Sequence, residues 1–271
     1  MKSCALVFVR HRKKLSLELK LLMAVAALAM LATAGPFVSQ PSSYHDFADQ
    51  RVLWQLPFAM DVLSNLAFAA WGAICIGLAW PWPRLGHVAR EASSVQGNMA
   101  LLFAVGLLIT TSCSGWYHLH LSDAGLAIDR VGMVFAFAGL LGLAAGGRAG
   151  TQAGLWLAAC VLLFGPLSVL AWSLTGNVTP WLVLQFGGLA LLVWFACLDT
   201  LEGALPIRWS LVIMFYAAAK CMELADYNVY EWTGHVLSGH SLKHVVASCA
   251  AWPVVSALLQ QRTHKGLTGS P

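Results

Sequence analysis

Residues 239–260 read GHSLKHVVASCAAWPVVSALLQ, an almost uninterrupted apolar segment that opens with two histidines. Its length is close to the ~20 residues that cross a bilayer as a helix. His240 and His244 stand four residues apart, so on a helix they lie on the same face. The segment therefore predicts a membrane-spanning helix that carries part of a metal site near its start. Lys243 lies one residue off that face, so we expect it to reach the interface or to pair with a carboxylate.

The composition of the whole chain is that of a membrane protein. Of its 271 residues 59% are hydrophobic and only 10% are charged, and the mean hydropathy is +0.70. A soluble domain of this length needs far more polar surface. The formal net charge is only +4, and we expect no nucleic-acid partner. The cysteines show no CxxC spacing, which argues against a disulfide framework or a thiolate metal site.

Seven further apolar segments precede this one, at about 21–34, 61–80, 96–118, 128–146, 152–172, 179–201 and 207–226. The fold class we predict is an all-α membrane protein, a seven-transmembrane-helix bundle with one additional N-terminal hydrophobic helix. Residues 1–36 form the basic N-terminus and a signal-anchor helix, 37–60 an extracytoplasmic loop, 61–260 the seven-helix core and 261–271 a cytoplasmic tail. Ala32-Thr33-Ala34 resembles a signal-peptidase site, but the long basic region favours an uncleaved anchor.

Basic residues predict the orientation of these segments. With both ends of the chain in the cytoplasm, most basic residues outside the N-terminal cluster fall on the cytoplasmic side: Arg84, Arg90, Arg148, Arg208, Arg262 and Lys265. The opposite side receives Arg51, and Arg130 lies at a membrane edge. We therefore expect a multi-pass protein with cytoplasmic termini.

Under this threading, polar side chains from three segments meet near the extracytoplasmic side. They are Ser114, His118, Asp129, His240 and His244. Ionisable groups inside membrane segments are costly and usually functional. Catalytic zinc takes three protein ligands and keeps a fourth place for water. Three histidines with a nearby carboxylate suit this chemistry.

Each of these residues has an expected role. His118, His240 and His244 would bind zinc, and Asp129 would act as general base and acid. Ser114 lies one turn before His118, where its hydroxyl could stabilise an oxyanion. An HxxxH pair alone could also bind haem. His120 and His235 are on the same side, and we interpret them as interfacial, His120 being the more plausible substitute ligand.

Two other polar groups have open interpretations. Lys220, Glu223 and Asp226 are spaced three residues apart, which favours a self-neutralising cluster that stabilises the bundle or orients the zinc ligands. The stretch 44–51, YHDFADQR, is followed by Asp61. Its carboxylates could hold calcium. Equally, the stretch could form a hydrogen-bonded lid, with Asp61 as a helix cap.

The order of these motifs resembles the alkaline ceramidase family, membrane hydrolases related to the adiponectin-receptor-like proteins. The resemblance covers roughly residues 44 to 260. It rests on Ser114-x3-His118, Asp129 eleven residues later and His240-x3-His244, with support from Asp61-x2-Ser64-Asn65 and Asp226-Tyr227-Asn228. Residues 44–51 look more like the bacterial branch, which implies the inner membrane of a bacterium.

The resemblance implies a seven-helix fold that binds zinc through the three matching histidines and hydrolyses the amide bond of ceramides. Ser114 and Asp129 would be its catalytic serine and aspartate. Eukaryotic members also hold calcium, and Asp46 and Asp49 would correspond to two of its ligands. Phe58, however, stands where a further acidic ligand is expected.

The leading hypothesis from the sequence is thus a zinc-dependent hydrolase of a ceramide-like membrane lipid. The alternative is a receptor-like or transport protein with a structural zinc site, in which Ser114 and Asp129 have no chemical role. The sequence leaves the acyl chain, the head group and the oligomeric state open.

Overall fold

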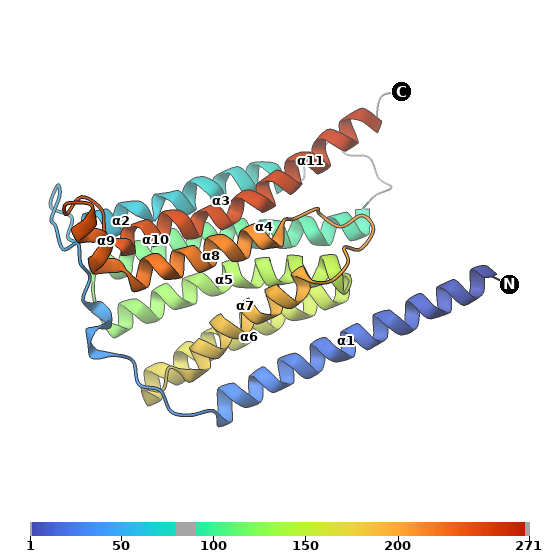
Figure 1. The fold of residues 1–271 in the computed structure, drawn as a ribbon, viewed down its shortest axis with the longest axis horizontal. Helices are drawn as coiled ribbons and strands as arrows, with labels where there is room; N and C mark the ends of the chain where they lie inside the picture. Colours follow the sequence, from blue (N-terminus) through green and yellow to red (C-terminus); the bar gives the residue numbers. More distant parts are fainter. Residues whose placement is uncertain (1, 80–89, 269–271) are drawn as a thin grey trace.

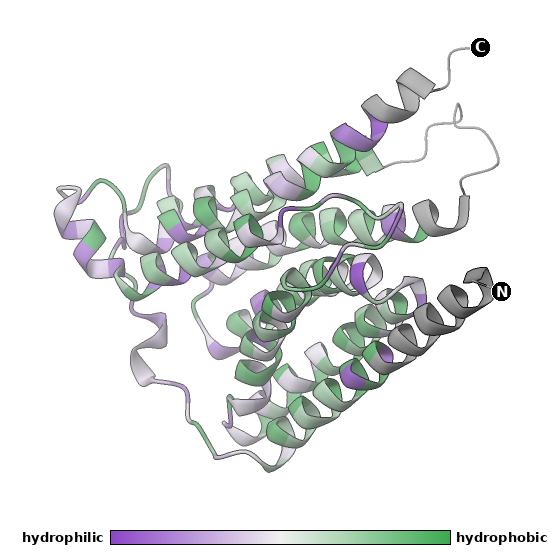
Figure 2. Cartoon of the chain, turned by 45° about the vertical axis from the view of Figure 1, so that its right-hand side comes forward, coloured by the Kyte–Doolittle hydropathy of each residue, from purple (hydrophilic) through white to green (hydrophobic). Residues whose placement is uncertain are grey.

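The structure, a computed structural model, describes residues 2–79 and 90–268, with side chains described for 17–79 and 95–262. Within these ranges the chain is mostly helical, and its only extended pairings are two isolated bridges. Seven of the described helical spans are long and apolar enough to cross a membrane. Figure 2 shows hydrophobic residues along most of the length of these helices. The prediction of an all-α membrane bundle is confirmed.

The helices follow the expected order. They are α1 (Lys2–Ala34), α2 (Ala59–Ser64), α3 (Leu66–Ala79), α4 (Arg90–Leu119), α5 (Asp123–Arg148), α6 (Thr151–Thr175), α7 (Thr179–Ala196), α8 (Trp209–Leu224), α9 (Asp226–Trp232), α10 (Gly239–Ser248) and α11 (Trp252–Thr268). Two short 3-10 turns, Ser42–His45 and Cys249–Ala251, complete the described elements. α8 has 16 residues and is not among the seven spans able to cross a membrane, although the sequence predicts a spanning segment there.

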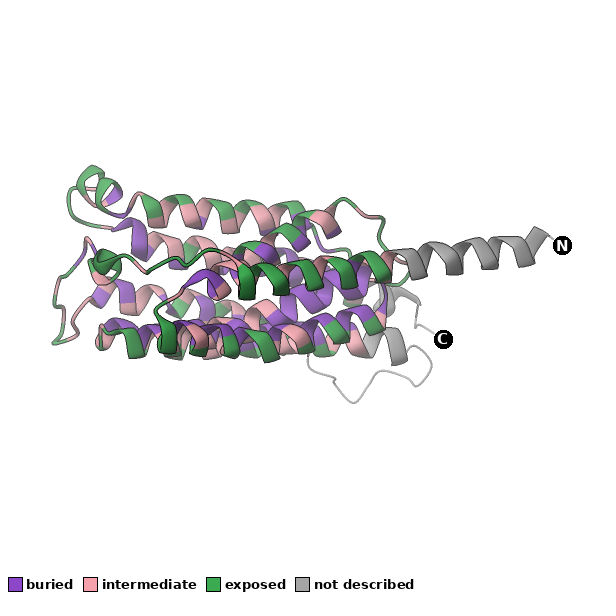
Figure 3. Cartoon of the chain, turned by 90° about the horizontal axis from the view of Figure 1, so that it is seen from below, coloured by how far each residue is buried: buried purple, intermediate pink, exposed green. Residues whose placement is uncertain are grey.

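The helices lie side by side in one bundle (Figure 1). α5 packs between α4 and α6, α3 packs on α4, and α10 packs on α8. α1 contacts α7 on the outside of the bundle, and most of its described residues are exposed (Figure 3). The start of α1 and the end of α11 lie at one end of the bundle, whereas α2, α9 and the start of α10 lie at the other (Figure 1).

Glycines let the central helices approach closely. A Cβ atom at Gly139 of α5 would lie 2.3 Å from the backbone nitrogen of Phe103 in α4. At Gly106 of α4 it would lie 2.2 Å from the backbone nitrogen of Ala136. Small residues at such crossings allow the backbone contact that drives helix association in lipid.

Three segments that the sequence predicts as single helices are interrupted. The first, 61–80, breaks at Asn65, whose side-chain amide donates to the carbonyl oxygen of Asp61 at 2.8 Å and takes the place of a helical bond. The last, 239–260, passes through a 3-10 turn before Pro253, because proline removes a helical donor and crowds the preceding turn. A third segment, 207–226, divides at Ala225 into α8 and α9.

Some of the basic residues behind the predicted orientation cannot be placed. Arg84 lies outside the described residues. The N-terminal basic cluster, Arg10, Arg12, Lys13 and Lys14, also lies outside the range of described side chains, as do Arg90 and Lys265.

Candidate metal centre and adjoining cavity

Three histidine side chains meet where α4 ends and α10 begins. His118, His240 and His244 are 1%, 5% and 5% exposed. Each offers a ring nitrogen, and these atoms all lie within 4.8 Å of one another. Among residues 17–79 and 95–262, no other three side chains of the metal-binding types are grouped this way. The structure therefore brings together the three histidines that the sequence predicts as metal ligands.

The spacing of the His118 and His240 ring nitrogens fits a tetrahedral metal ion. Nε2 of His118 lies 3.3 Å from Nε2 of His240. Two imidazole nitrogens at ~2.0–2.1 Å from one zinc ion, with a tetrahedral angle between them, are about 3.3 Å apart. Nδ1 of His244 lies 2.8 Å from the hydroxyl of Ser64, which leaves Nε2 of this ring for a metal. The residues present thus fit a three-nitrogen metal site.

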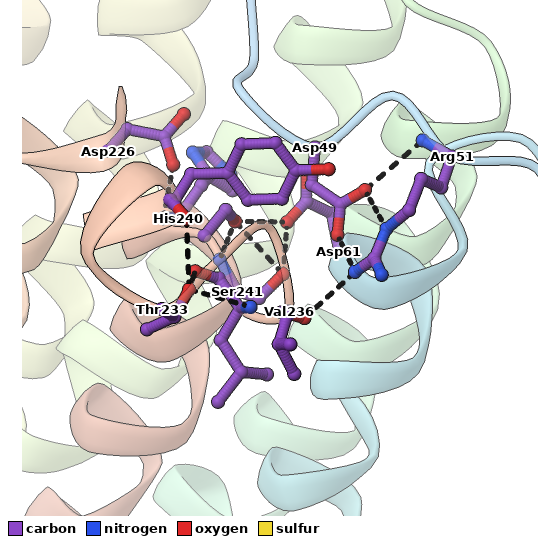
Figure 4. Close-up of polar contacts among 11 residues, drawn as sticks. Asp49, Arg51, Asp61, Asp226, Thr233, Val236, His240 and Ser241 are labelled. Atoms are coloured by element: carbon purple, nitrogen blue, oxygen red, sulfur yellow. Dashed lines mark hydrogen bonds and ion pairs between the residues drawn. The ribbon is translucent and has the colours of Figure 1, made fainter. Parts of the chain in front are cut away.

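Polar contacts at the first turn of α10 position two of these histidines. Ser238 caps the helix, and its hydroxyl accepts from the backbone N–H of Ser241 at 2.9 Å. The Asp226 carboxylate accepts from the backbone N–H of His240 at 2.7 Å (Figure 4). A Cβ atom at Gly239 would lie 2.2 Å from a carbonyl oxygen of α8, so this close approach requires glycine.

A buried carboxylate ties α2 to the start of α10. Asp61 is fully buried and accepts from the hydroxyls of Ser241 at 2.6 Å and Ser238 at 3.3 Å (Figure 4). The expectation that Asp61 caps a helix is wrong, because α2 begins at Ala59 and Phe58 holds the capping position. Our reading of the sequence missed the two serines, although serine at the start of a helical span is a known capping signal.

Residues 44–51 form a lid over the histidines. The Phe47 ring is 4% exposed, and its centroid lies 4.2 Å from that of His240 and 5.0 Å from that of His118. The backbone N–H of Ala48 donates to Asp226 at 3.0 Å, so one carboxylate holds both the lid and α10. These contacts agree with the hydrogen-bonded lid, one of the two alternatives for this stretch.

The other alternative, a calcium site, is weakened by an internal cation. The Asp49 carboxylate is 1% exposed and accepts from Nε of Arg51 at 2.8 Å and from Nη2 at 2.5 Å (Figure 4). This hydrogen bonding raises the pKa of Arg51. Asp46 is nearer the surface, where its carboxylate accepts from the Gln50 amide at 3.4 Å and from the Tyr227 hydroxyl, whose pKa it raises. The prediction of calcium at Asp46 and Asp49 remains a prediction, and the guanidinium on Asp49 argues against it.

A cavity of about 100 Å³ lies beside His244 inside the bundle. Ser114 and Asp129, the two predicted catalytic residues, line it together with this histidine. The Ser114 hydroxyl hydrogen-bonds the Asp129 carboxylate. Asp129 lies on the second turn of α5, because this helix begins at Asp123 and not at 128 as the sequence predicts. The structure therefore places both side chains on the wall of one cavity with a candidate metal ligand.

A half-buried ion-pair cluster forms another part of the cavity wall. The Glu223 carboxylate accepts from Nζ of Lys220 at 2.6 Å and from Nζ of Lys243 at 2.7 Å. This pairing confirms the expectation for Lys243. Asp226, which the sequence places on the same stripe, begins a new helix and contacts the lid and α10 instead.

Two further histidines on this side lie outside the cluster. The exposed His120 ring stacks on Trp116 with centroids 4.0 Å apart. The exposed His235 ring lies 3.0 Å from the Glu231 carboxylate. His120 is therefore not placed to replace one of the three clustered histidines.

No protein-family model matches this chain, and no curated protein matches it. The resemblance to the alkaline ceramidases rests on the motifs of the chain itself. The observations that bear on function are the three-histidine cluster, the polar cavity beside it and the lid above it.

Proposed function

We propose that this chain is a zinc-dependent hydrolase that cleaves the amide bond of a ceramide-like membrane lipid. One observation carries the proposal: Ser114 and Asp129 share a cavity wall with His244, next to His118 and His240. A metal site that only stabilises the bundle needs neither a carboxylate nor a hydroxyl beside it. A hydrolytic site needs both, and it needs room for a substrate.

The roles of the side chains follow from their chemistry. His118, His240 and His244 would hold zinc, which when bound polarises a carbonyl group and activates water at neutral pH. Asp129 accepts the proton that water loses and returns it to the leaving nitrogen, so the products are an amine and a fatty acid. In the resting site the Ser114 hydroxyl donates to the Asp129 carboxylate. Once Asp129 has accepted the proton of water, its O–H donates to the Ser114 oxygen, and the Ser114 hydroxyl is free to donate to the oxygen that gains negative charge.

The surroundings of the cavity favour a lipid substrate. Phe47 covers two of the histidines on the side of the lid. The cavity itself lies among helices long and apolar enough to span a membrane, and its wall includes apolar residues such as Phe68 and Met133. A substrate that approaches from the bilayer needs no opening through the lid.

The test measures metal content and lipid-amide hydrolysis on the same purified protein. We expect about one zinc ion per chain in the wild type. Asp129→Asn should keep its zinc and lose activity by about 10²–10⁴-fold. Ser114→Ala should keep its zinc and lose about 10²-fold or more. Ser112→Ala is the matched control, because the Ser112 hydroxyl is exposed and donates to a carbonyl oxygen of its own helix.

Two results would contradict the proposal. One is wild-type protein without zinc. The other is unchanged hydrolysis in Asp129→Asn. If zinc is bound and no lipid amide is cleaved, the receptor-like or transport alternative with a structural zinc site is favoured.

A further inference from the structure

One arginine in the cavity wall has incomplete hydrogen bonding. Arg130 of α5 is 3% exposed and lines the cavity that holds Asp129 and Ser114. Its Nη2 donates to the side-chain oxygen of Gln40 at 2.6 Å. Within the described part of the chain, Nε and Nη1 of Arg130 have no hydrogen-bond acceptor. Buried donors without an acceptor destabilise the folded protein, and more so when the group is charged.

Aromatic rings surround the Arg130 guanidinium without neutralising it. Its central carbon lies 4.2 Å from the ring centroid of Trp172, 5.4 Å from that of Tyr44 and 5.5 Å from that of Trp181. Ring faces attract a cation, but they offer only weak acceptors to its N–H groups. None of the ion pairs found among the described residues includes Arg130. The Arg130 guanidinium is therefore held in place, while its Nε and Nη1 donors have no acceptor.

The charged residues of the cavity wall leave an excess of positive charge. The cations are Arg130, Lys220 and Lys243, and the anions are Asp129 and Glu223. Glu223 already bonds both lysines. A divalent metal ion beside His244 would add to the excess. Because charges interact more strongly in a water-poor interior, such a cavity favours an anionic ligand over a neutral one.

We propose that Arg130 binds an acidic group of the substrate, so that this chain acts on amide lipids with a carboxylate or phosphate on the amine side of the amide. A neutral ceramide would leave the two Arg130 nitrogens without acceptors. An acid group would satisfy them and offset the excess charge, and charged hydrogen bonds of this kind are the strong ones. That the bound lipid carries an amide to be cleaved rests on the proposed hydrolase function. That the cavity binds an anion rests on the unpaired donors of Arg130.

Matched lipids test this directly. N-palmitoylglycine and N-palmitoylethanolamine differ by a carboxylate in place of a hydroxymethyl group. Ceramide 1-phosphate and ceramide differ by one phosphate. Binding of each lipid to the purified full chain is measured in detergent, by calorimetry, on metal-depleted protein so that no turnover intervenes. We expect the acidic member of at least one pair to bind about tenfold or more tightly, and the preferred pair identifies the acid.

Arg130→Gln should remove most of that preference and change the affinity for the neutral lipids by no more than about threefold. Arg208→Gln is the control, because Arg208 is exposed and does not line this cavity. Equal wild-type affinity within both pairs overturns the proposal, and this comparison does not depend on whether Arg130→Gln folds. A preference that persists in folded Arg130→Gln also overturns it. Arg130-dependent binding without hydrolysis in zinc-loaded protein would retain the anion site and reject the hydrolase.

Discussion

The Nε2 atoms of His118 and His240 lie 3.3 Å apart, although 122 residues separate them along the chain. His118 is on the last turn of α4, and His240 is on the first turn of α10. Their rings are buried under Phe47, and without a metal ion the Nε2–H of one ring can donate to Nε2 of the other. A metal ion with His244 as third ligand would replace this hydrogen bond by coordination to both nitrogens.

Replacing one of these histidines should remove the metal. His118→Ala should lose most of its zinc, because two nitrogens and water hold zinc far more weakly than three nitrogens do. It should also lower the melting temperature, since a ligand at ~100 times its Kd adds about 2.7 kcal/mol of stability. Zinc content and thermal unfolding, with and without a chelator, measure both effects. His120→Ala should behave as the wild type, and equal zinc loss in the two variants would refute the ligand assignment.

Ser64 should tune the affinity of the site for metal. Its hydroxyl lies 2.8 Å from Nδ1 of His244 and orients that ring. Ser64→Ala should weaken zinc binding by about 10–100-fold, the usual effect of losing such a partner. Titration against a competing chelator measures the change. Ser112→Ala should leave the affinity unchanged. Wild-type affinity in Ser64→Ala would show that this hydrogen bond does not orient the ligand.

Gly239 should be intolerant of even one added methyl group. A Cβ atom there would lie 2.2 Å from a backbone oxygen of α8, so α10 must move and carry His240 with it. We expect Gly239→Ala to lose zinc and to unfold at lower temperature. Gly97→Ala is the control, because a Cβ atom at Gly97 meets nothing within 4 Å. That variant should gain up to ~1 kcal/mol from helix propensity. Full zinc content in Gly239→Ala would contradict the expected displacement.

The pair of Asp49 and Arg51 should make the lid independent of calcium. Arg51→Gln leaves the buried Asp49 carboxylate without its cation, which should cost about 1–3 kcal/mol. Thermal unfolding and limited proteolysis of the lid measure this loss. For the wild type, we expect the same melting temperature with and without added calcium in a calcium-free buffer, with zinc kept constant. A marked rise with calcium would instead support the calcium site at Asp46 and Asp49.

Much of this architecture is visible in the sequence, because hydropathy and helical spacing are local properties. Apolar stretches of about 20 residues predict the spans, and the spacing of His240 and His244 places them on one helical face. Polar residues are so rare in such spans that His118 and Asp129 stand out as candidates. Local patterns also explain the wrong prediction for Asp61. An aspartate at the start of an apolar run is typical of a helix cap, and the serines that it bonds instead are far away in the sequence.

Only the tertiary structure decides which of these side chains meet. Asp61 accepts from Ser241 across 180 residues of chain, and Arg130 reaches Gln40 across 90. Contacts of this kind depend on how each helix is rotated and shifted relative to its neighbours. Glycine contacts between helices, and helix breaks such as the one at Asn65, determine this rotation and shift across the whole bundle. The sequence alone therefore determines the membrane-spanning helices and the candidate ligands. The packing decides that His118 lies beside the other two histidines and that Arg51 pairs with Asp49. It also leaves two nitrogen donors of Arg130 without acceptors.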